Sequence, residues 1–167
     1  KKNKSQFNTL QKKIKLKIKK FPIKINSNGE WYYNGSLIRK KTLIKLFSSI
    51  LKADNNGNFF LETPAEKGSI EVEDSPFVIT SFFIKKKGSK QKIIFRTNID
   101  DDVCLGKKNP LVFKKKNNNY VPYIILDKNL KARILRSIYY QLINVSSKDK
   151  KGNKYNIKSQ GIHFELK

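Results

Sequence analysis

The chain has few of the residues on which several common kinds of protein chemistry depend. Its 167 residues include no methionine, one cysteine and one histidine, Cys104 and His163. A single cysteine excludes a disulfide framework, a CxxC redox pair and a thiolate metal cage. A Ser-His-Asp triad would need His163 as its base, and the sequence I-H-F-E-L around it is typical of a strand. We therefore expect His163 to be a strand residue, and we predict no catalytic residues, no metal site and no cofactor.

Long apolar runs and nucleotide-binding loops are also missing. No run approaches the ~20 residues of a membrane-spanning helix, and no apolar signal-peptide core follows the first lysines. The sequence contains no Walker loop, no G-x-G-x-x-G and no G-x-S-x-G. Hydrophobic residues make up 38% of the chain, with 11 Phe and 7 Tyr, which is enough for a packed core. We expect a globular, cytoplasmic protein whose oligomeric state is open.

Acidic residues are scarce beside basic ones. The chain has 13 Asp and Glu against 37 Lys and Arg, a formal net charge of +24. Such an excess favours polyanion binding by counterion release. However, only four of the basic residues are arginine, the residue that grips phosphates and bases bidentately. Two interpretations remain open: a solvated lysine surface, or a surface that binds nucleic acid or another polyanion.

Eight of the 13 acids lie in two short segments, which we call the acidic islands. They are Glu62, Glu66, Glu71, Glu73 and Asp74 in the first, and Asp100, Asp101 and Asp102 in the second. Three consecutive carboxylates point in different directions, which suits a solvated turn better than the alternating ligands of a Ca²⁺ loop. A pair of carboxylates, one from each island, could act as acid and base in hydrolysis if the fold brought them together.

Within the first island, T-P-A-E at Thr63–Glu66 fits a capping box. Thr63 would be the N-cap, Glu66 would reach back from the third helical position, and Gly68 would end a single helical turn. Asp74 would close an Asx-turn ahead of Ser-Pro. The alternative is functional, because free N–H groups at a helical N-terminus attract anions and Lys67 is adjacent.

Hydrophobic periodicity predicts the order of elements. Residues 1–24 contain ten lysines and no acid, and their apolar residues fit both a helix and a strand. The first Asn-Gly, Asn28-Gly29, has the composition of a type I′ turn between two strands. The expected strands are 23–25, 31–33, 59–62, 69–72, 77–84, 92–97, 111–113, 120–126, 155–158 and 162–166, and the expected helices are 39–53 and 131–145.

The order strand, helix, Gly-terminated turn, strand, strand occurs twice, with G-N-F-F-L-E-T-P at Gly57 and G-N-K-Y-N-I-K-S at Gly152. We interpret this as a duplicated α+β unit, although two common motifs could also follow one another by chance. The predicted organisation is a basic leader (1–21), an N-terminal unit (22–84) and a C-terminal unit (85–167). Small units are marginally stable alone, so the two should share an apolar interface. Clefts at such interfaces are preferred ligand sites.

Taken together, several short motifs resemble the bacterial domain of unknown function 1285 family. They are G-E-W-Y-Y-N-G-S-L-I-R at 29–39, L-F-S-S-I-L at 46–51, T-P-A-E-K at 63–67, V-E-D-S-P-F at 72–77, R-T-N at 96–98, N-P-L at 109–111, P-Y-I at 122–124 and R-S-I-Y-Y-Q-L at 136–142. The lysine-rich segment 11–24 departs from the family pattern.

The resemblance implies two α+β domains that arose by duplication, with a C-terminal half loosely similar to pleckstrin-homology folds. It also implies a ligand cleft at the domain interface and a part in signalling. The family positions carry over to Arg39, Thr63, Pro64, Glu66, Lys67, Asp74, Pro76, Phe77, Thr97, Asn98, Pro122, Tyr123 and Arg136.

We therefore predict a non-enzymatic regulatory or sensor module that binds a small anionic or nucleotide-like ligand between its halves. Tyr123 or Trp31 would offer a stacking face. The predicted ligand-binding residues are Arg39, Thr63, Glu66, Lys67, Asp74, Thr97, Asn98, Tyr123 and Arg136. A carboxylate-using hydrolase and generic polyanion binding through the lysines are the alternatives.

Overall fold

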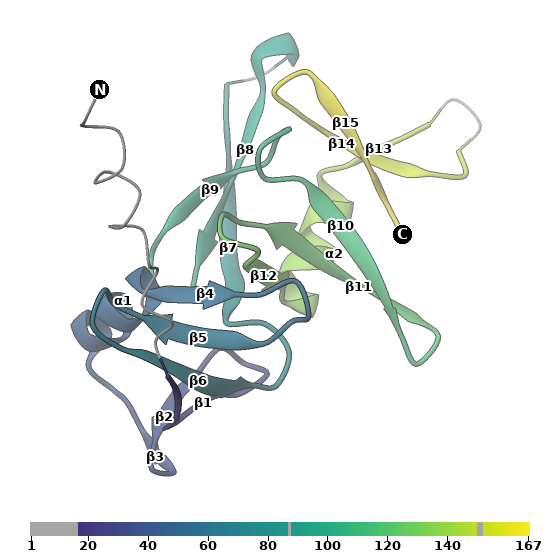
Figure 1. Ribbon diagram of the computed structural model, residues 1–167. Helices are drawn as coiled ribbons and strands as arrows, with labels where there is room; N and C mark the ends of the chain where they lie inside the picture. Colours follow the sequence, from purple (N-terminus) through teal and green to yellow (C-terminus); the bar gives the residue numbers. More distant parts are fainter. Residues whose placement is uncertain (1–16, 87, 150–151) are drawn as a thin grey trace, which may run out of the picture.

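In the part of the chain that the structure describes, the N-terminal half forms one six-stranded sheet with one helix beside it (Figure 1). The computed structural model describes residues 17–86, 88–149 and 152–167. The strands are arranged β3-β2-β1-β6-β5-β4, with β1 parallel to β6 and all other neighbours antiparallel. The elements are β1 (Ile18–Ile25), β2 (Trp31–Tyr33), β3 (Ser36–Leu37), α1 (Lys41–Ser49), β4 (Leu51–Ala53), β5 (Phe59–Glu62) and β6 (Lys67–Val72).

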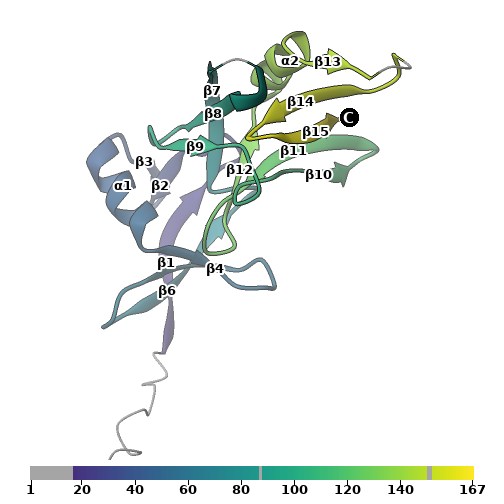
Figure 2. The same ribbon diagram turned by 90° about the horizontal axis from the view of Figure 1, so that it is seen from above.

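The C-terminal half contains a second six-stranded sheet, arranged β10-β11-β12-β7-β8-β9. Helix α2 and a three-stranded sheet, β13-β14-β15, follow it, on the side of the molecule away from α1 (Figures 1 and 2). The elements are β7 (Phe77–Lys85), η1 (Gly88–Lys90), β8 (Lys92–Thr97), β9 (Asp102–Cys104), β10 (Leu111–Lys116), β11 (Asn119–Ile125), β12 (Lys131–Ile134), α2 (Arg136–Asn144), β13 (Ser147–Lys148), β14 (Tyr155–Ser159) and β15 (Ile162–Leu166).

The two large sheets have the same topology. Each consists of two three-stranded antiparallel meanders, and the first strand of one meander pairs in parallel with the last strand of the other, β1 with β6 and β7 with β12. The predicted architecture of two related α+β halves is confirmed, with more strand than helix. The register of the repeat differs from our alignment of Gly57 with Gly152, because topology relates residues 18–72 to 77–134.

The two predicted helices are shorter than expected. Residues Leu51–Ala53, placed at the end of the first helix, form β4, and residues Lys131–Ile134, placed at the start of the second, form β12. Leu51 is fully buried opposite Leu61 of β5. Alternate residues of β12, Ala132 and Ile134, are buried. Apolar residues two apart fit a strand, but they also fit the edge of the apolar face of a helix. Periodicity alone therefore does not distinguish a strand from a helix in these segments.

The type I′ turn is formed by the second Asn-Gly pair. Asn34 and Gly35 join the paired residues Tyr33 and Ser36, with positive φ angles of 47° and 78°, as this turn requires. Asn28-Gly29 lies instead in the longer loop between Ile25 and Trp31. The Asn26 side chain organises that loop, since its Oδ1 accepts hydrogen bonds from the N–H groups of residues 28 and 30 at 3.0 Å each.

The junction of the halves lies just before β7. We assigned β7 to the N-terminal unit, but it pairs with β8 and β12 of the C-terminal sheet. The alternation of apolar and polar residues predicts a strand, but it does not predict which strands pair with it. The end of the predicted leader, from Ile18, belongs to β1 and pairs with β6. The question of helix or strand for the apolar residues before it lies outside the described residues.

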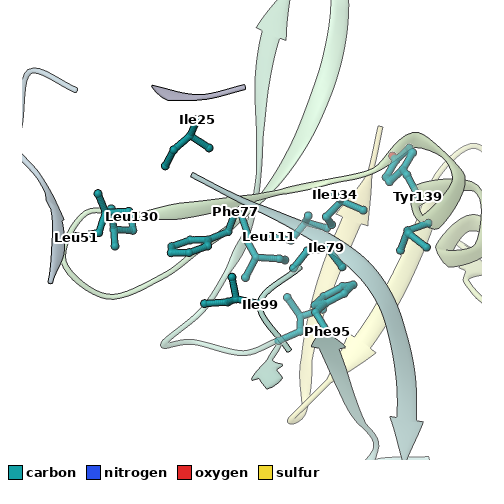
Figure 3. Close-up of a cluster of buried hydrophobic side chains, with 14 of the residues drawn as sticks. Ile25, Leu51, Phe77, Ile79, Phe95, Ile99, Leu111, Leu130, Ile134 and Tyr139 are labelled. Atoms are coloured by element: carbon teal, nitrogen blue, oxygen red, sulfur yellow. The ribbon is translucent and has the colours of Figure 1, made fainter. Parts of the chain in front are cut away.

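One buried cluster spans both halves (Figure 3). It includes Ile25 and Leu51 from the first sheet and Phe77, Leu111 and Leu130 from the C-terminal half. The halves therefore share a core, which holds the surfaces that meet at their junction in a defined arrangement.

Candidate functional site

Asp74 lies at the junction of the two halves and binds three strands of the C-terminal sheet. Its side chain is 8% exposed. Its Oδ1 accepts hydrogen bonds from the Tyr123 hydroxyl at 2.8 Å and from Lys116 Nζ at 2.6 Å. Its Oδ2 lies 3.5 Å from Arg133 Nε. A carboxylate on the connection between β6 and β7 thus contacts residues of β10, β11 and β12.

The register of these strands explains why the basic residues gather. Val112, Tyr123 and Arg133 are directly opposite one another on β10, β11 and β12. Side chains alternate between the faces of a strand, so Lys114 and Lys116 share the face of Val112. By the same rule Lys131 shares the face of Arg133. The opposite face of these strands carries the buried residues Leu111, Ile124 and Ala132.

We call Lys114, Lys116, Lys131 and Arg133 the cationic cluster. Lys131 Nζ lies 4.5 Å from the centroid of the Tyr123 ring. Arg133 donates a hydrogen bond to the Ser27 carbonyl at 2.6 Å, whereas its buried Nε has no hydrogen-bond partner among the described residues. Lys116 and Arg133 contact the Asp74 carboxylate, Lys114 and Lys131 lie on the same face of the sheet, and positive charge is in excess.

The pKa shifts in this cluster follow from burial and from these contacts. Burial raises the pKa of Asp74, but the hydrogen bonds from Lys116 and Tyr123 outweigh it and leave that pKa below its usual value. Burial, and next the hydrogen bond to Asp74, raise the pKa of Tyr123. Burial and the neighbouring Lys114 lower the pKa of Lys131 to about 8. Lys116 and Tyr123 thus engage the negative charge of Asp74, so that charge offsets little of the positive charge of Lys131.

A cavity of about 420 Å³ opens between the halves beside the cationic cluster. The β4–β5 turn forms one wall, and Lys114, Asn129 and Lys131 contribute to the other. Asp54 and Asp74 also line it. Asp54 Oδ1 accepts hydrogen bonds from two N–H groups of its own turn, at 2.9 and 2.8 Å, and Asp74 Oδ1 is occupied by Lys116 and Tyr123. Within the described residues, neither lining lysine forms an ion pair with a carboxylate, although Asp74 acts on Lys131 at longer range. A cavity wall with two unpaired lysines favours the binding of an anion.

A larger cavity, of about 700 Å³, lies between α1 and the C-terminal half. Its charges are balanced, and several are already paired. Lys108 lies 3.5 Å from Asp127, and Lys128 donates a hydrogen bond to the last turn of α1 at 3.0 Å. Thr97 lines this cavity, but it is buried and its hydroxyl accepts a hydrogen bond from the backbone of Asp101 at 3.2 Å. Because its charges are balanced, this cavity favours an anion less than the cavity beside the cationic cluster does.

The predicted ligand-binding residues are spread over several places. Asp74 and Tyr123 contact each other in the cationic cluster, and Thr97 lines the 700 Å³ cavity. Thr63 and Glu66 line a separate cavity of about 300 Å³ in the N-terminal half. The two acidic islands thus face different cavities.

The T-P-A-E segment forms the turn between β5 and β6, and the predicted helical turn is wrong. The Thr63 hydroxyl does accept a hydrogen bond from the Glu66 N–H at 3.1 Å. However, the Thr63 N–H donates to the backbone carbonyl of Glu66 at 2.8 Å, and the Glu66 carboxylate binds Lys19 at 2.6 Å. Lys67 pairs with Glu62 at 3.0 Å. Without a helix, this segment has no helical N-terminus to attract an anion.

Asn98 links the two halves through its side chain. It donates a hydrogen bond to the Gly29 carbonyl at 2.9 Å and accepts one from the Val78 N–H at 3.1 Å. Arg136, at the start of α2, donates to the Tyr140 hydroxyl at 3.0 Å and lines a further cavity. Arg39 is exposed between β3 and α1.

Neither predicted stacking ring offers a free face. Trp31 and Tyr123 are both fully buried. The Trp31 ring stacks on Phe47, with centroids 6.1 Å apart, and Lys131 lies over the Tyr123 ring. Stacking of a ligand base on either ring is therefore excluded in this conformation. Aromatic side chains bury large apolar areas in a core, and the Trp31 and Tyr123 rings are both used in this way.

The acidic islands are largely engaged in ion pairs. Arg96 binds Asp102 through two hydrogen bonds, at 2.8 and 3.1 Å, and Lys41 binds Asp100 at 3.1 Å. Glu73 accepts hydrogen bonds from the Ser27 N–H at 2.8 Å and lies 2.9 Å from Lys24. Within the described part of the chain, no three His, Cys, Asp or Glu residues are grouped as metal ligands would be.

Sequence reasoning missed the basic half of the candidate site. The signal was present as two alternating pairs, Lys114 with Lys116 and Lys131 with Arg133, each on one strand face. Among 33 lysines such pairs do not stand out. In addition, the sequence pattern predicts a helix over 131–145, and residues two apart on a helix, such as Lys131 and Arg133, do not share a face.

The described residues include no helix with the length and apolar character that crossing a membrane requires.

Comparison with protein families and solved structures gives consistent results. The N-terminal domain of the DUF1285 family, a domain of unknown function, matches residues 15–75, and its C-terminal domain matches residues 76–166. A crystal structure of a DUF1285 family protein from Silicibacter pomeroyi DSS-3 is similar, with 30% identity and a TM-score of 0.80, over 90% of this chain and 82% of that one.

A second DUF1285 crystal structure, from Shewanella baltica OS155, has 28% identity and a TM-score of 0.58, over 74% of this chain and 91% of that one. No curated protein matches the chain. Both domain matches meet at the junction before β7, and together they cover nearly all of the sequence. The chain therefore belongs to the DUF1285 family.

Proposed function

We propose that the protein binds a small anionic ligand, bearing a phosphate or carboxylate group, in the 420 Å³ cavity between its halves. In this proposal it acts as a non-enzymatic sensor module. The observation that carries the proposal is the charge of the cationic cluster. The cluster places four cations on one sheet face with one carboxylate, Asp74, and Lys116 and Tyr123 already occupy Asp74 Oδ1 at 2.6 and 2.8 Å. An anion beside Lys114 and Lys131 would neutralise the excess.

The position of the cavity supports a regulatory role. One wall is the β4–β5 turn of the N-terminal half, and the other belongs to the C-terminal sheet. An anion held between them would add contacts that join the halves, beside the hydrogen bonds from Asn129 to Asn55 at 3.2 Å and from the Ala53 N–H to the Lys128 carbonyl at 3.4 Å. Ligand binding would then stabilise one arrangement of the halves, which a signalling partner could recognise.

Thermal-shift and calorimetric titrations test this proposal, with inorganic phosphate, nucleotides and phosphorylated metabolites at constant ionic strength. A ligand at 100 times its Kd should stabilise the protein by about 2.7 kcal/mol. We expect the double variant Lys114→Gln with Lys131→Gln to bind at least tenfold more weakly, because the cavity loses the positive charges of its two lysines.

A matched control removes the same net charge elsewhere. Lys115 lies on β10 between Lys114 and Lys116 and points to the other face, and Lys90 lies in η1. The variant Lys115→Gln with Lys90→Gln should bind as the native protein does. An equal loss in both double variants, with affinity falling steeply with salt, would contradict the proposal and favour generic polyanion binding.

A further inference from the structure

We infer that Lys131 captures the carbonyl group of an anionic ligand as a reversible imine. The inference deepens the proposed function and rests on it, because the anionic group of the ligand would place the carbonyl carbon beside Lys131. The ligand class is accordingly an aldehyde or ketone that also carries a phosphate or carboxylate. A cavity of about 420 Å³ accommodates one molecule of that size.

The fold holds Lys131 as an oriented amine. Its backbone lies on β12, opposite Ile125 of β11, and the buried Ser75 hydroxyl donates a hydrogen bond to its carbonyl at 2.6 Å. Its Nζ lies 4.5 Å above the Tyr123 ring and lines the cavity. The side chain is thus partly desolvated at one end of the ligand space.

The neighbours of Lys131 favour its neutral, nucleophilic form. Burial and the adjacent Lys114 lower its pKa to about 8, and Lys116 acts in the same direction. Asp74 opposes the shift, but its charge is engaged by Lys116 and Tyr123. A lysine with its pKa lowered in this way has far more neutral amine near neutral pH than an ordinary lysine. A lysine beside a second cation is a known route to an activated amine.

The chemistry balances without any further reactant. The Lys131 nitrogen lone pair attacks the carbonyl carbon, and the carbonyl oxygen takes up a proton to give a carbinolamine. The C–O bond then breaks as the C=N bond forms, and the two protons lost by the amine leave in the water released. The Lys114 ammonium group, which lines the same cavity, can relay one of these protons: it donates a proton to the departing hydroxyl and takes back the proton that the nitrogen loses. Nothing is oxidised or reduced.

Labelling of the full chain with pyridoxal 5′-phosphate, which carries both an aldehyde and a phosphate, tests this inference. After borohydride reduction, peptide mapping should show the adduct on Lys131 at least tenfold above the average of the other lysines. Inorganic phosphate should compete with labelling, and pyridoxal, which lacks the phosphate, should label with little selectivity. An even distribution over the lysines would overturn the inference and leave anion binding intact.

Two variants separate reactivity from binding. Lys131→Arg keeps the charge but forms no imine, so the selective adduct should vanish while phosphate binding stays within about threefold. Lys128→Arg, on the neighbouring turn, should change neither. Lys114→Gln should slow labelling at pH 7 several-fold and move the midpoint of its pH profile upward, and an unchanged midpoint would contradict activation by Lys114. Selective labelling by pyridoxal alone, with no phosphate binding, would overturn the proposed function.

Discussion

At the scale of single residues, Asp74 shows how one side chain can serve both structure and the candidate site. It is a buried charge, which is costly unless hydrogen-bonded and paired. The Tyr123 hydroxyl and Lys116 supply those partners. Asp74 also holds the cationic cluster together, since without it four cations would repel one another. We predicted an Asx-turn for this residue, and its carboxylate instead reaches the C-terminal sheet.

Replacing Asp74 by Asn should destabilise the protein at pH 7 by about 1.5 to 3 kcal/mol, the range for hydrogen bonds to charged groups. The folded pKa of Asp74 is below its usual value. Its contribution is therefore present above the unfolded pKa of about 3.9 and is lost as pH falls through the folded pKa. Urea unfolding at pH 7 and at pH 3 measures both effects, and the difference between native protein and variant should shrink at the lower pH.

The matched control is Asp127→Asn. Asp127 is largely exposed and lies 3.5 Å from Lys108, so its loss should change stability by less than about 0.5 kcal/mol. Equal losses in the two variants would mean that the Asp74 contacts contribute no more than an ordinary surface pair.

At the scale of elements, the connections between strands decide how the halves meet. The turn after β8 places Asn98 against the β1–β2 loop and the start of β7. Its amide serves two buried backbone groups at once, one in each half. The positive φ of 75° at Gly29 and the 2.7 Å approach of Asn98 Nδ2 to the position of a Cβ there explain why glycine lies opposite.

Asn98→Ala should therefore cost about 1 to 3 kcal/mol, because the Gly29 carbonyl and the Val78 N–H lose their partner. Hydrogen exchange should show faster opening in both β7 and the β1–β2 loop. Asn144→Ala, at the exposed end of α2, is the matched control and should change stability by about 0.5 kcal/mol or less. A loss confined to one half would show that the amide does not couple the halves.

At the scale of the whole molecule, two sheets of the same topology share one core. Leu51 and Ile25 of the N-terminal half belong to the same buried cluster as Phe77 and Leu130 of the C-terminal half (Figure 3). Units of some 60 residues bury only about 60% of their unfolded surface. We therefore expect the halves to depend on each other and to unfold in one cooperative step.

Leu130→Ala tests this dependence, since Leu130 is 5% exposed in the turn between β11 and β12. The expected loss is about 2 to 5 kcal/mol, with a single transition by both fluorescence and circular dichroism. The exposed Leu46 of α1 is the matched control, and Leu46→Ala should cost less than about 1 kcal/mol. Two separate transitions would mean that the halves fold independently.

Much of the fold could be predicted because local patterns specify it. Strand β8 and strand β15 lie where the alternation placed them, and the existence of both helices followed from apolar residues at helical spacing. The predicted helices extend too far, because Leu51 and Ala132 belong to strands β4 and β12. The family motifs indicated the DUF1285 family, which the domain matches confirm.

The sequence by itself determined most of the longer strands, the existence of the two helices, the family and the excess of positive charge, because each depends on residues close together in the chain. Tertiary structure alone decided which strands pair, that Trp31 and Tyr123 are buried, and that Asp74 contacts Lys116 and Arg133. Those contacts join residues 42 and 59 positions apart, and no local pattern encodes such pairings. The candidate anion site exists only because β10 and β12, with Tyr123 of β11 between them, place their basic residues on one face of the sheet, at the junction of the halves.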